Sequence, residues 1–394
     1  MIKNLFIVGT GNIVNALGGF VFVLAAAKVL SVSEYGTFAL LTSIFILTAK
    51  LTELGTTSSF VSFSVKQNRS PFLGLLTLKV GMTILAFLFT LVVLYIYAQF
   101  NLTNVVLFFV GFVGYALNDY LFAVFQEKEK FLGTTLVNSL PAGLKLLFGA
   151  AIWFEFFKTT GSQVLGIYLL ALLASVLIFP LLPSVDLSKN VNLKTDIENL
   201  IRLGFPGGFS QMLNLSIPAI NGSLLYFTLS THELGVFTFA DKIASIMTLV
   251  GLSIFTVLLP KKAKDFKLTN NYSFNQLIPL IVIVIFSVTV IVMTASPVIS
   301  NLFGQKYVES IFILKILAVT GGVNAVCLFL DNFFFVTEST KKLLGISFVK
   351  VTTLAVIGYF ACLSYGVAGL AYVNLIVASL FLLVTVIGIK LIRR

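Results

Sequence analysis

Apolar residues occur along this chain in long runs, and polar residues are concentrated in the short stretches between the runs. Each run has about 20 residues or more, the length that a helix needs to cross the hydrocarbon core of a bilayer. The runs cover residues 5–30, 36–57, 73–99, 104–125, 132–157, 164–183, 204–228, 234–259, 276–301, 309–336, 343–364 and 366–389. A membrane β-barrel would show alternating segments of about ten residues instead. The pattern therefore predicts an all-α polytopic membrane protein with about twelve transmembrane helices.

The composition excludes most other classes of protein. Of 394 residues, 58% are hydrophobic and 10% are charged, whereas soluble proteins carry about 25% charged residues. This composition excludes a soluble enzyme, a disordered chain and a nucleic-acid-binding domain. The net charge is +11, but the lysines and arginines form no patch that could bind nucleic acid. The chain has one histidine, and its two cysteines lie inside apolar runs, so these residues offer no metal site. We therefore expect no metal and no cofactor.

Basic residues in the loops predict the orientation of the chain in the membrane. With the N-terminus inside, seventeen loop lysines and arginines lie on the inner side and three, Lys28, Lys158 and Lys306, lie on the outer side. Positively charged loops stay in the cytoplasm, so both termini are predicted to be cytoplasmic.

A long polar stretch at the middle of the chain predicts two halves. It is expected to form a cytoplasmic linker over residues 184–203, between an N-terminal six-helix lobe (1–183) and a C-terminal six-helix lobe (204–394). Within the linker, Leu193–Arg202 can be read as a short interfacial helix or as a plain connector.

The two halves repeat each other. Residues 30–38 and 229–237 share the pattern L-S-x-x-E-x-G-x-F, and Glu34 and Glu233 stand where helices begin. Residues 119–133 and 331–345 match a second time, around Asp119 and Asp331. Because each half has an even number of spans, the repeat is parallel, with a pseudo-two-fold axis along the membrane normal. Such repeats are typical of transporters, with the substrate site between the lobes, so we expect a central inter-lobe cavity.

Two segments resemble Wzx-type polysaccharide flippases, including O-antigen flippases. They are AAAKVLSVSEYGTFALLTSIFILTAKLTELG and, before the tenth span, LFGQKYVES. These belong to the MOP (multidrug/oligosaccharidyl-lipid/polysaccharide) exporter superfamily. The resemblance implies alternating access in the bacterial cytoplasmic (inner) membrane. The substrate would be an oligosaccharide linked to undecaprenyl phosphate or diphosphate, moved from the inner to the outer leaflet. It also implies a cation-lined cavity, contact with membrane lipid and work alongside other polysaccharide-assembly proteins.

Polar side chains inside the spans are the candidate substrate-binding residues. Gln211, Asn214 and Asn221 share one face of the seventh span with Pro218, which is expected to kink it. Asn12 and Asn15 occupy the equivalent face of the first span. These amides either line a hydrated cavity or make hydrogen bonds between helices.

Lysines inside the spans are the second group of candidates. A charge inside the membrane costs free energy, so each such residue is a candidate for a functional role. Lys50 shares a face of the second span with Glu53, and it either binds the substrate phosphate or forms a structural ion pair. Lys242 lies on a polar face of the eighth span, and Lys145 lies about 20 Å deep in the fifth. Lys28, at the end of the first span, either attracts anions or reaches the interface.

Four acids are candidates for coupling transport to H⁺ or Na⁺: Asp119, Asp331, Asp241 and Glu53. For Asp119 and Asp331 the alternative is an ion pair with a neighbouring lysine. A MATE-like drug or cation antiporter would have an acidic cavity, whereas lysines outnumber buried acids here. A membrane-embedded glycan polymerase would need large external loops, and the loops are short.

Overall fold

The computed structural model of the chain describes residues 2–67, 69–156, 158–183, 192–248, 274–275, 277–337 and 339–393. Throughout these ranges the regular structure is helical and there is no β-strand. Helices suit the long apolar runs because they satisfy every backbone hydrogen bond within the segment. Eight of the described helices are long and apolar enough to cross a membrane, so the chain is a multi-pass membrane protein.

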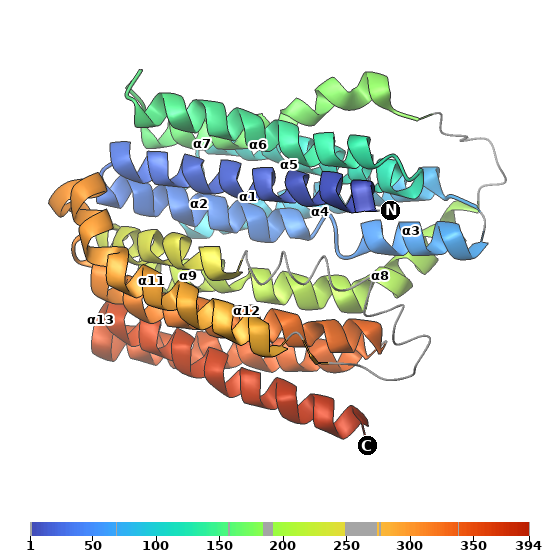
Figure 1. The fold of residues 1–394 in the computed structure, drawn as a ribbon. Helices are drawn as coiled ribbons and strands as arrows, with labels where there is room; N and C mark the ends of the chain where they lie inside the picture. The colour runs from blue at the N-terminus through green and yellow to red at the C-terminus, as the bar shows by residue number, and fades with distance from the viewer. Residues whose placement is uncertain are drawn as a thin grey trace. The chain divides into compact units, whose positions relative to one another are not determined.

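Packing divides the helices between two compact units (Figure 1). Unit 1 contains α1 (Ile2–Val29), the second part of α2 (Val32–Lys50), α3 (Thr56–Gln67), α4 (Phe72–Ile96), α5 (Leu102–Glu127), α6 (Phe131–Trp153), α7 (Gly161–Leu170), the 3-10 helix η1 (Ala171–Leu181) and α8 (Leu193–Leu215). Unit 2 contains Leu30–Leu40, α9 (Ile217–Thr228), a helix over residues 231–248, α11 (Leu277–Phe303), the 3-10 helix η2 (Gly304–Tyr307), α12 (Ser310–Val336) and α13 (Thr340–Arg393).

The sequence predicted a boundary between the two halves at residues 203/204. In the structure, the helices that pack together as unit 1 end at Leu215, and unit 2 resumes at Ser216. The segment Leu193–Arg202 is not a plain connector, because it forms the first part of α8, which packs on α3 and α4. The rest of the expected linker, residues 184–191, lies outside the described residues.

A proline and a glycine interrupt the helices, and the sequence predicted the first of them. The predicted kink at Pro218 is a break between α8 and α9, with Pro218 in the first turn of α9, where its missing N–H leaves no hydrogen bond unmade. Gly366, with φ of 59°, interrupts α13 between the last two apolar runs. A positive φ favours glycine, because a Cβ there would clash with the backbone.

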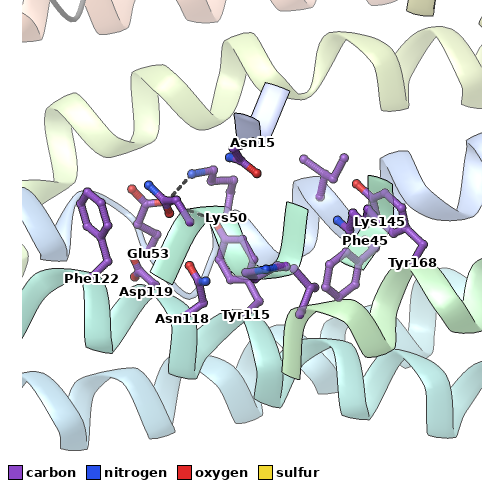
Figure 2. Close-up of a pocket in the computed structure, with 14 residues that line it drawn as sticks. Asn15, Phe45, Lys50, Glu53, Tyr115, Asn118, Asp119, Phe122, Lys145 and Tyr168 are labelled. Carbon is purple, nitrogen blue, oxygen red and sulfur yellow. Dashed lines mark hydrogen bonds and ion pairs between the residues drawn. The ribbon is translucent and has the colours of Figure 1, made fainter. Parts of the chain in front are cut away.

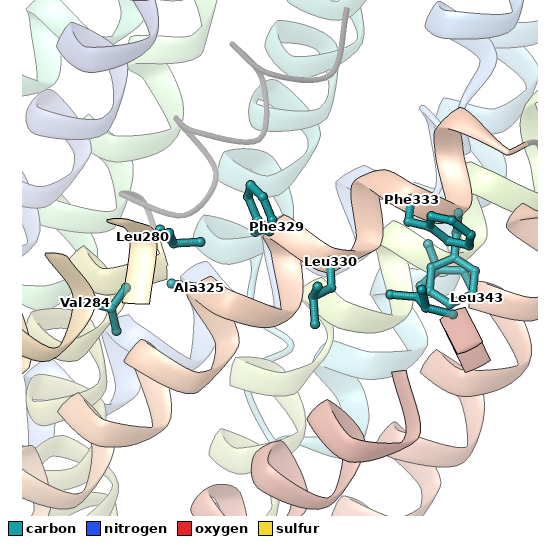
Figure 3. Close-up of a cluster of buried hydrophobic side chains, with 9 residues drawn as sticks. Leu280, Val284, Ala325, Phe329, Leu330, Phe333 and Leu343 are labelled. Atoms are coloured by element: carbon teal, nitrogen blue, oxygen red, sulfur yellow. The ribbon is translucent and has the colours of Figure 1, made fainter. Parts of the chain in front are cut away.

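Each unit has apolar packing of its own. In unit 1, α1 packs along α6 (Figure 1), and their backbones approach closely because Gly18 lies against Ala142 and Gly149 lies against Phe22. In unit 2, side chains of α11, α12 and α13 form a buried cluster that includes Leu280, Phe329, Phe333 and Leu343 (Figure 3). The outward faces of α4 and α11 carry exposed large apolar side chains, as lipid-facing helices do.

The two copies of the repeated motif have the same local structure. Ser31 and Glu34 form a capping box at the start of α2. At the start of the 231–248 helix the Ser230 hydroxyl donates to Glu233 and accepts from its backbone N–H, as the Ser31 hydroxyl does with Glu34. Both motifs belong to unit 2, where they touch through their glycines. A Cβ on Gly36 would lie 2.4 Å from the carbonyl oxygen of Thr231, and a Cβ on Gly235 would lie 2.1 Å from that of Val32. The contact is reciprocal, as local two-fold symmetry requires.

Candidate functional site

Unit 1 contains a cavity of about 370 Å³ (Figure 2). Its lining comes from α1, α2 and the turn after it, α5, α6, α7 and η1, so residues far apart in sequence meet in one place. The lining residues are Asn15, Phe45, Ile46, Lys50, Glu53, Tyr115, Asn118, Asp119, Phe122, Asn138, Pro141, Lys145, Tyr168 and Leu172. Five of the residues predicted from sequence lie here: Asn15, Lys50, Glu53, Asp119 and Lys145.

Lys50 and Glu53 form an ion pair at the cavity wall. Tyr115 donates a hydrogen bond from its hydroxyl to Glu53 Oε2 at 3.2 Å, and its ring centroid lies 5.8 Å from Lys50 Nζ. Both charged side chains keep about a quarter of their surface exposed. The pair is therefore neutral overall, but its atoms remain within reach of a molecule in the cavity.

Asp119 forms an ion pair with Lys79 of α4. Lys79 is only 2% exposed, and its ammonium also donates to Thr56 Oγ1 at 2.7 Å and to the carbonyl oxygen of Thr52 at 3.1 Å. Thr57 donates to the second carboxylate oxygen of Asp119 at 2.9 Å. The structure therefore favours the ion-pair alternative for Asp119, with a lysine that sequence reasoning had not named as its partner.

Lys145 differs from these two lysines. Its side chain is 8% exposed, and its ammonium lies 3.6 Å from the ring centroid of Tyr168. Among the described residues no carboxylate pairs with it. Figure 2 shows Lys145 and Tyr168 at one end of the cavity and Glu53, Asp119 and Phe122 at the other. The first end consequently carries an amine that no carboxylate of the described residues balances.

Pro141 shapes the α6 wall of the cavity. Proline has no N–H, so it cannot donate to the carbonyl four residues earlier, which is that of Val137. Asn118 of α5 supplies the missing donor, because its side-chain nitrogen lies 2.7 Å from the Val137 oxygen. One cavity-lining amide is thereby used to support the backbone of α6.

The candidate residues of unit 2 are not among the residues that line this cavity. Lys242 and Asp241 are half-buried on the 231–248 helix. Asp331 of α12 is also half-buried and makes no ion pair or hydrogen bond with a described residue. Asn221 is not free to line a cavity, because it exchanges two hydrogen bonds with Asn374 of α13, at 3.0 and 3.1 Å. The alternative of bonding between helices therefore holds for Asn221.

The remaining candidates are spread over unit 1. Lys28 donates to the carbonyl oxygen of Trp153 at 2.9 Å and lies over its indole ring, which places it at the end of α6. Gln211 is exposed, and Asn214 bonds back to the Ser210 carbonyl oxygen at 3.3 Å. The side chain of Asn12 lies outside the described part of the structure.

Sequence reasoning missed several residues of the cavity. Tyr115, Asn118 and Phe122 share one face of α5 with Asp119, and Asn138 shares one face of α6 with Lys145. Their helical spacing is visible in the sequence. Tyr168 carries no such signal, because only the fold brings α7 beside α6.

Solved structures similar to this chain include a MATE transporter and a lipid flippase. A multidrug resistance MATE family transporter of the MOP superfamily, in an inward-facing conformation, matches with a TM-score of 0.74 at 15% identity, covering 96% of this chain and 95% of that one. The lipid II flippase MurJ, in an inward closed conformation, matches with a TM-score of 0.74 at 14% identity, covering 99% and 88%. At these identities the likeness shows that this chain has the MOP transporter fold.

Comparison by sequence gives the family. No curated protein sequence matches the chain. The family model described as "Polysaccharide biosynthesis protein" matches residues 1–264, which is well over half of the chain. Together with the MOP fold and the membrane-spanning helices, this match shows that the chain belongs to the polysaccharide biosynthesis protein family.

Proposed function

We propose that this protein is a flippase for a lipid-linked oligosaccharide. Its substrate would carry undecaprenyl phosphate or diphosphate and would cross from the inner to the outer leaflet of the bacterial cytoplasmic membrane by alternating access. The product would serve the synthesis of cell-surface polysaccharide. The observation that carries the proposal is the buried Lys145, which lines the cavity of unit 1 and has no carboxylate partner among the described residues.

The charges around the cavity favour an anionic substrate. Lys50 is balanced by Glu53, and Lys79 is balanced by Asp119. Lys145 is left over, so this group has a net charge of one positive unit when Lys145 is protonated. An anion entering a site of low dielectric would be attracted strongly, and a phosphate would replace part of the hydration that Lys145 lost on burial.

The proposal includes the twelve-span arrangement in two six-helix lobes, with both termini in the cytoplasm. The matching serine–glutamate hydrogen bonds at the two helix starts and the reciprocal contact of Gly36 and Gly235 support the parallel repeat. In it, Lys50 and Lys242 lie on polar faces of the two repeat-equivalent second helices of the lobes, and both join Lys145 as substrate-binding cations.

A MATE-like drug or cation antiporter is the second candidate. One observation favours it: Asp331 is half-buried and forms no ion pair with a described residue. A carboxylate in that state can bind H⁺, Na⁺ or a cationic drug. In the flippase, the same residue would couple export to an ion gradient.

The test uses purified protein in proteoliposomes. A fluorescent undecaprenyl diphosphate oligosaccharide should reach the opposite leaflet faster with the wild-type protein than with empty vesicles. The triple variant Lys50→Gln, Lys145→Gln, Lys242→Gln should lose this acceleration while its reconstituted amount is unchanged. Lys158→Gln, in which an exposed lysine is replaced, is the matched control. Ethidium efflux driven by a proton gradient, without lipid transfer, would support the antiporter and contradict the flippase.

A further inference from the structure

The segment Leu30–Leu40, which we call the strap, packs in a different unit from the chain on either side of it. The chain before it, up to Val29, belongs to unit 1, and α2 returns to unit 1 at Leu41, but the strap between them packs within unit 2. Peptide bonds therefore join the strap to unit 1, and side-chain contacts join it to unit 2. These contacts decide whether this part of the chain can leave unit 2.

A cluster of aromatic rings holds the strap in unit 2. Tyr35 packs edge-to-face on Phe239 of the 231–248 helix and on Tyr307 of η2, with ring centroids 6.3 and 6.0 Å apart. Phe239 stacks on Tyr307 at 3.9 Å and meets Phe303, at the end of α11, edge-to-face at 4.8 Å. Phe38 of the strap lies beside Tyr35 at 6.2 Å. Such ring pairs add to the stabilisation that burial gives, so they favour the attached strap.

Two backbone contacts lie beside the rings. The ammonium of Lys306, the residue before Tyr307, donates a hydrogen bond to the carbonyl oxygen of Leu30, where the strap begins. One turn into α2, Gly36 and Gly235 let the two backbones approach with no side chain between them. The strap is therefore attached to unit 2 at its first residue, along its backbone and through its rings.

One group in this contact opposes the attachment. The side chain of Tyr35 is 0% exposed, and its hydroxyl is buried without a hydrogen-bond partner among the described residues. A hydroxyl that leaves water without gaining a hydrogen bond costs free energy. This cost disappears when the strap detaches and the hydroxyl meets water. A phenylalanine would make the same ring contacts without the cost, so the hydroxyl of Tyr35 makes the attached strap less stable than its rings allow.

We propose that the strap is a releasable closure on the outer side of the protein, and that the unpaired hydroxyl of Tyr35 weakens it enough to open in each transport cycle. The inference rests on the proposed function, because the outer side follows from the proposed orientation and delivery to the outer leaflet requires an opening there. It adds where this opening is held shut and what makes it reversible. Elements that move during function are drawn from the less stable parts of a protein, and a perfectly satisfied contact would open too slowly.

Cysteine labelling of the full chain in intact cells measures the opening. In a background without Cys327 and Cys362, the reporter is Val32→Cys, at a position of the strap that is buried against Gly235. A membrane-impermeant maleimide reaches it only when the strap is detached. Tyr35→Phe should slow the labelling about tenfold, because the attached state no longer buries an unpaired hydroxyl. It should also raise the melting temperature by about 2–4 °C. Phe239→Leu, which removes ring contacts, should speed the labelling several-fold.

Tyr365→Phe is the matched control, because Tyr365 is 77% exposed and lies outside the ring cluster. It should label and melt like the protein with Val32→Cys alone. Unchanged labelling with Tyr35→Phe would overturn the role of the hydroxyl. Unchanged labelling with Phe239→Leu would overturn the ring cluster as the closure.

Transfer of the fluorescent undecaprenyl diphosphate oligosaccharide in proteoliposomes links the strap to transport. Tyr35→Phe should lower the rate of transfer several-fold, although the variant protein is more stable than the wild type. Slower labelling with an unchanged transfer rate would overturn release of the strap as a step of the cycle. Absence of transfer by the wild-type protein would contradict the flippase, whereas the labelling rates would still support or overturn the releasable strap.

Discussion

At the scale of single residues, unit 1 shows how a polar side chain repairs a backbone defect. Pro141 leaves the carbonyl oxygen of Val137 without its helical donor, and Asn118 supplies one from α5. Because a buried carbonyl without a partner costs free energy, Asn118 is predicted to be structural even though it lines the cavity.

The first prediction follows from this bond. Asn118→Leu should lower the free energy of unfolding by about 1–3 kcal/mol, since the Val137 oxygen loses its donor. In a Pro141→Ala background the same change should cost much less, because the alanine introduced there would supply a backbone N–H to Val137. Thermal melting of the four proteins in one detergent measures the cycle. Equal costs in both backgrounds would show that Asn118 acts in another way.

Lys79 and Asp119 form an ion pair, which is the second feature at the scale of single residues. Removing one partner leaves the other charge buried, which costs about 3–5 kcal/mol. Lys79→Met and Asp119→Leu should therefore each lower the melting temperature strongly, and the double variant should recover part of the loss. Lys158→Gln, at an exposed position, should melt like the wild type. Wild-type melting of both single variants would contradict the buried ion pair.

At the scale of elements, glycines set how closely helices approach. Gly36 and Gly235 leave no room for a Cβ where the starts of α2 and of the 231–248 helix meet in unit 2. Gly345 of α13, by contrast, has nothing within 4 Å of the place where its Cβ would be.

The third prediction compares these glycines. Gly36→Ala and Gly235→Ala should each destabilise the protein by roughly 1–3 kcal/mol, because the added methyl group meets a backbone oxygen and overpacks the contact. Gly345→Ala should be neutral or slightly stabilising, since alanine is the better helix former. Melting temperatures in detergent decide between these outcomes. Similar effects at all three positions would show that helix propensity, and not the reciprocal contact, governs them.

At the scale of the whole molecule, the distribution of loop charges gives the fourth prediction. In a background without Cys327 and Cys362, both buried, single cysteines are placed at two exposed positions, Lys130 and Thr103. A membrane-impermeant maleimide added to intact cells should label Thr103→Cys and leave Lys130→Cys unlabelled until the cells are opened. Positively charged loops favour the cytoplasmic side. The reverse pattern would invert the proposed orientation.

The sequence alone determined the class of the protein and most of its local structure. Long apolar runs predicted helices because a helix is the form in which an uninterrupted apolar segment can satisfy its backbone in a bilayer. The kink at Pro218 and the helix starts at Glu34 and Glu233 were equally visible. These features depend on residues within a few positions of one another, so they can be derived without knowing the fold.

Only the tertiary structure decided which polar side chains have an ion-pair or hydrogen-bond partner among the described residues and which have none. Lys79 pairs with Asp119 across 40 positions, and Asn221 pairs with Asn374 across 153. Lys145, equally polar in sequence, has an aromatic ring beside it and no carboxylate partner among the described residues. Whether a buried charge is neutralised depends on contacts between distant helices, because electrostatic attraction acts over a few ångströms of space. The periodicity of one helix does not contain that information.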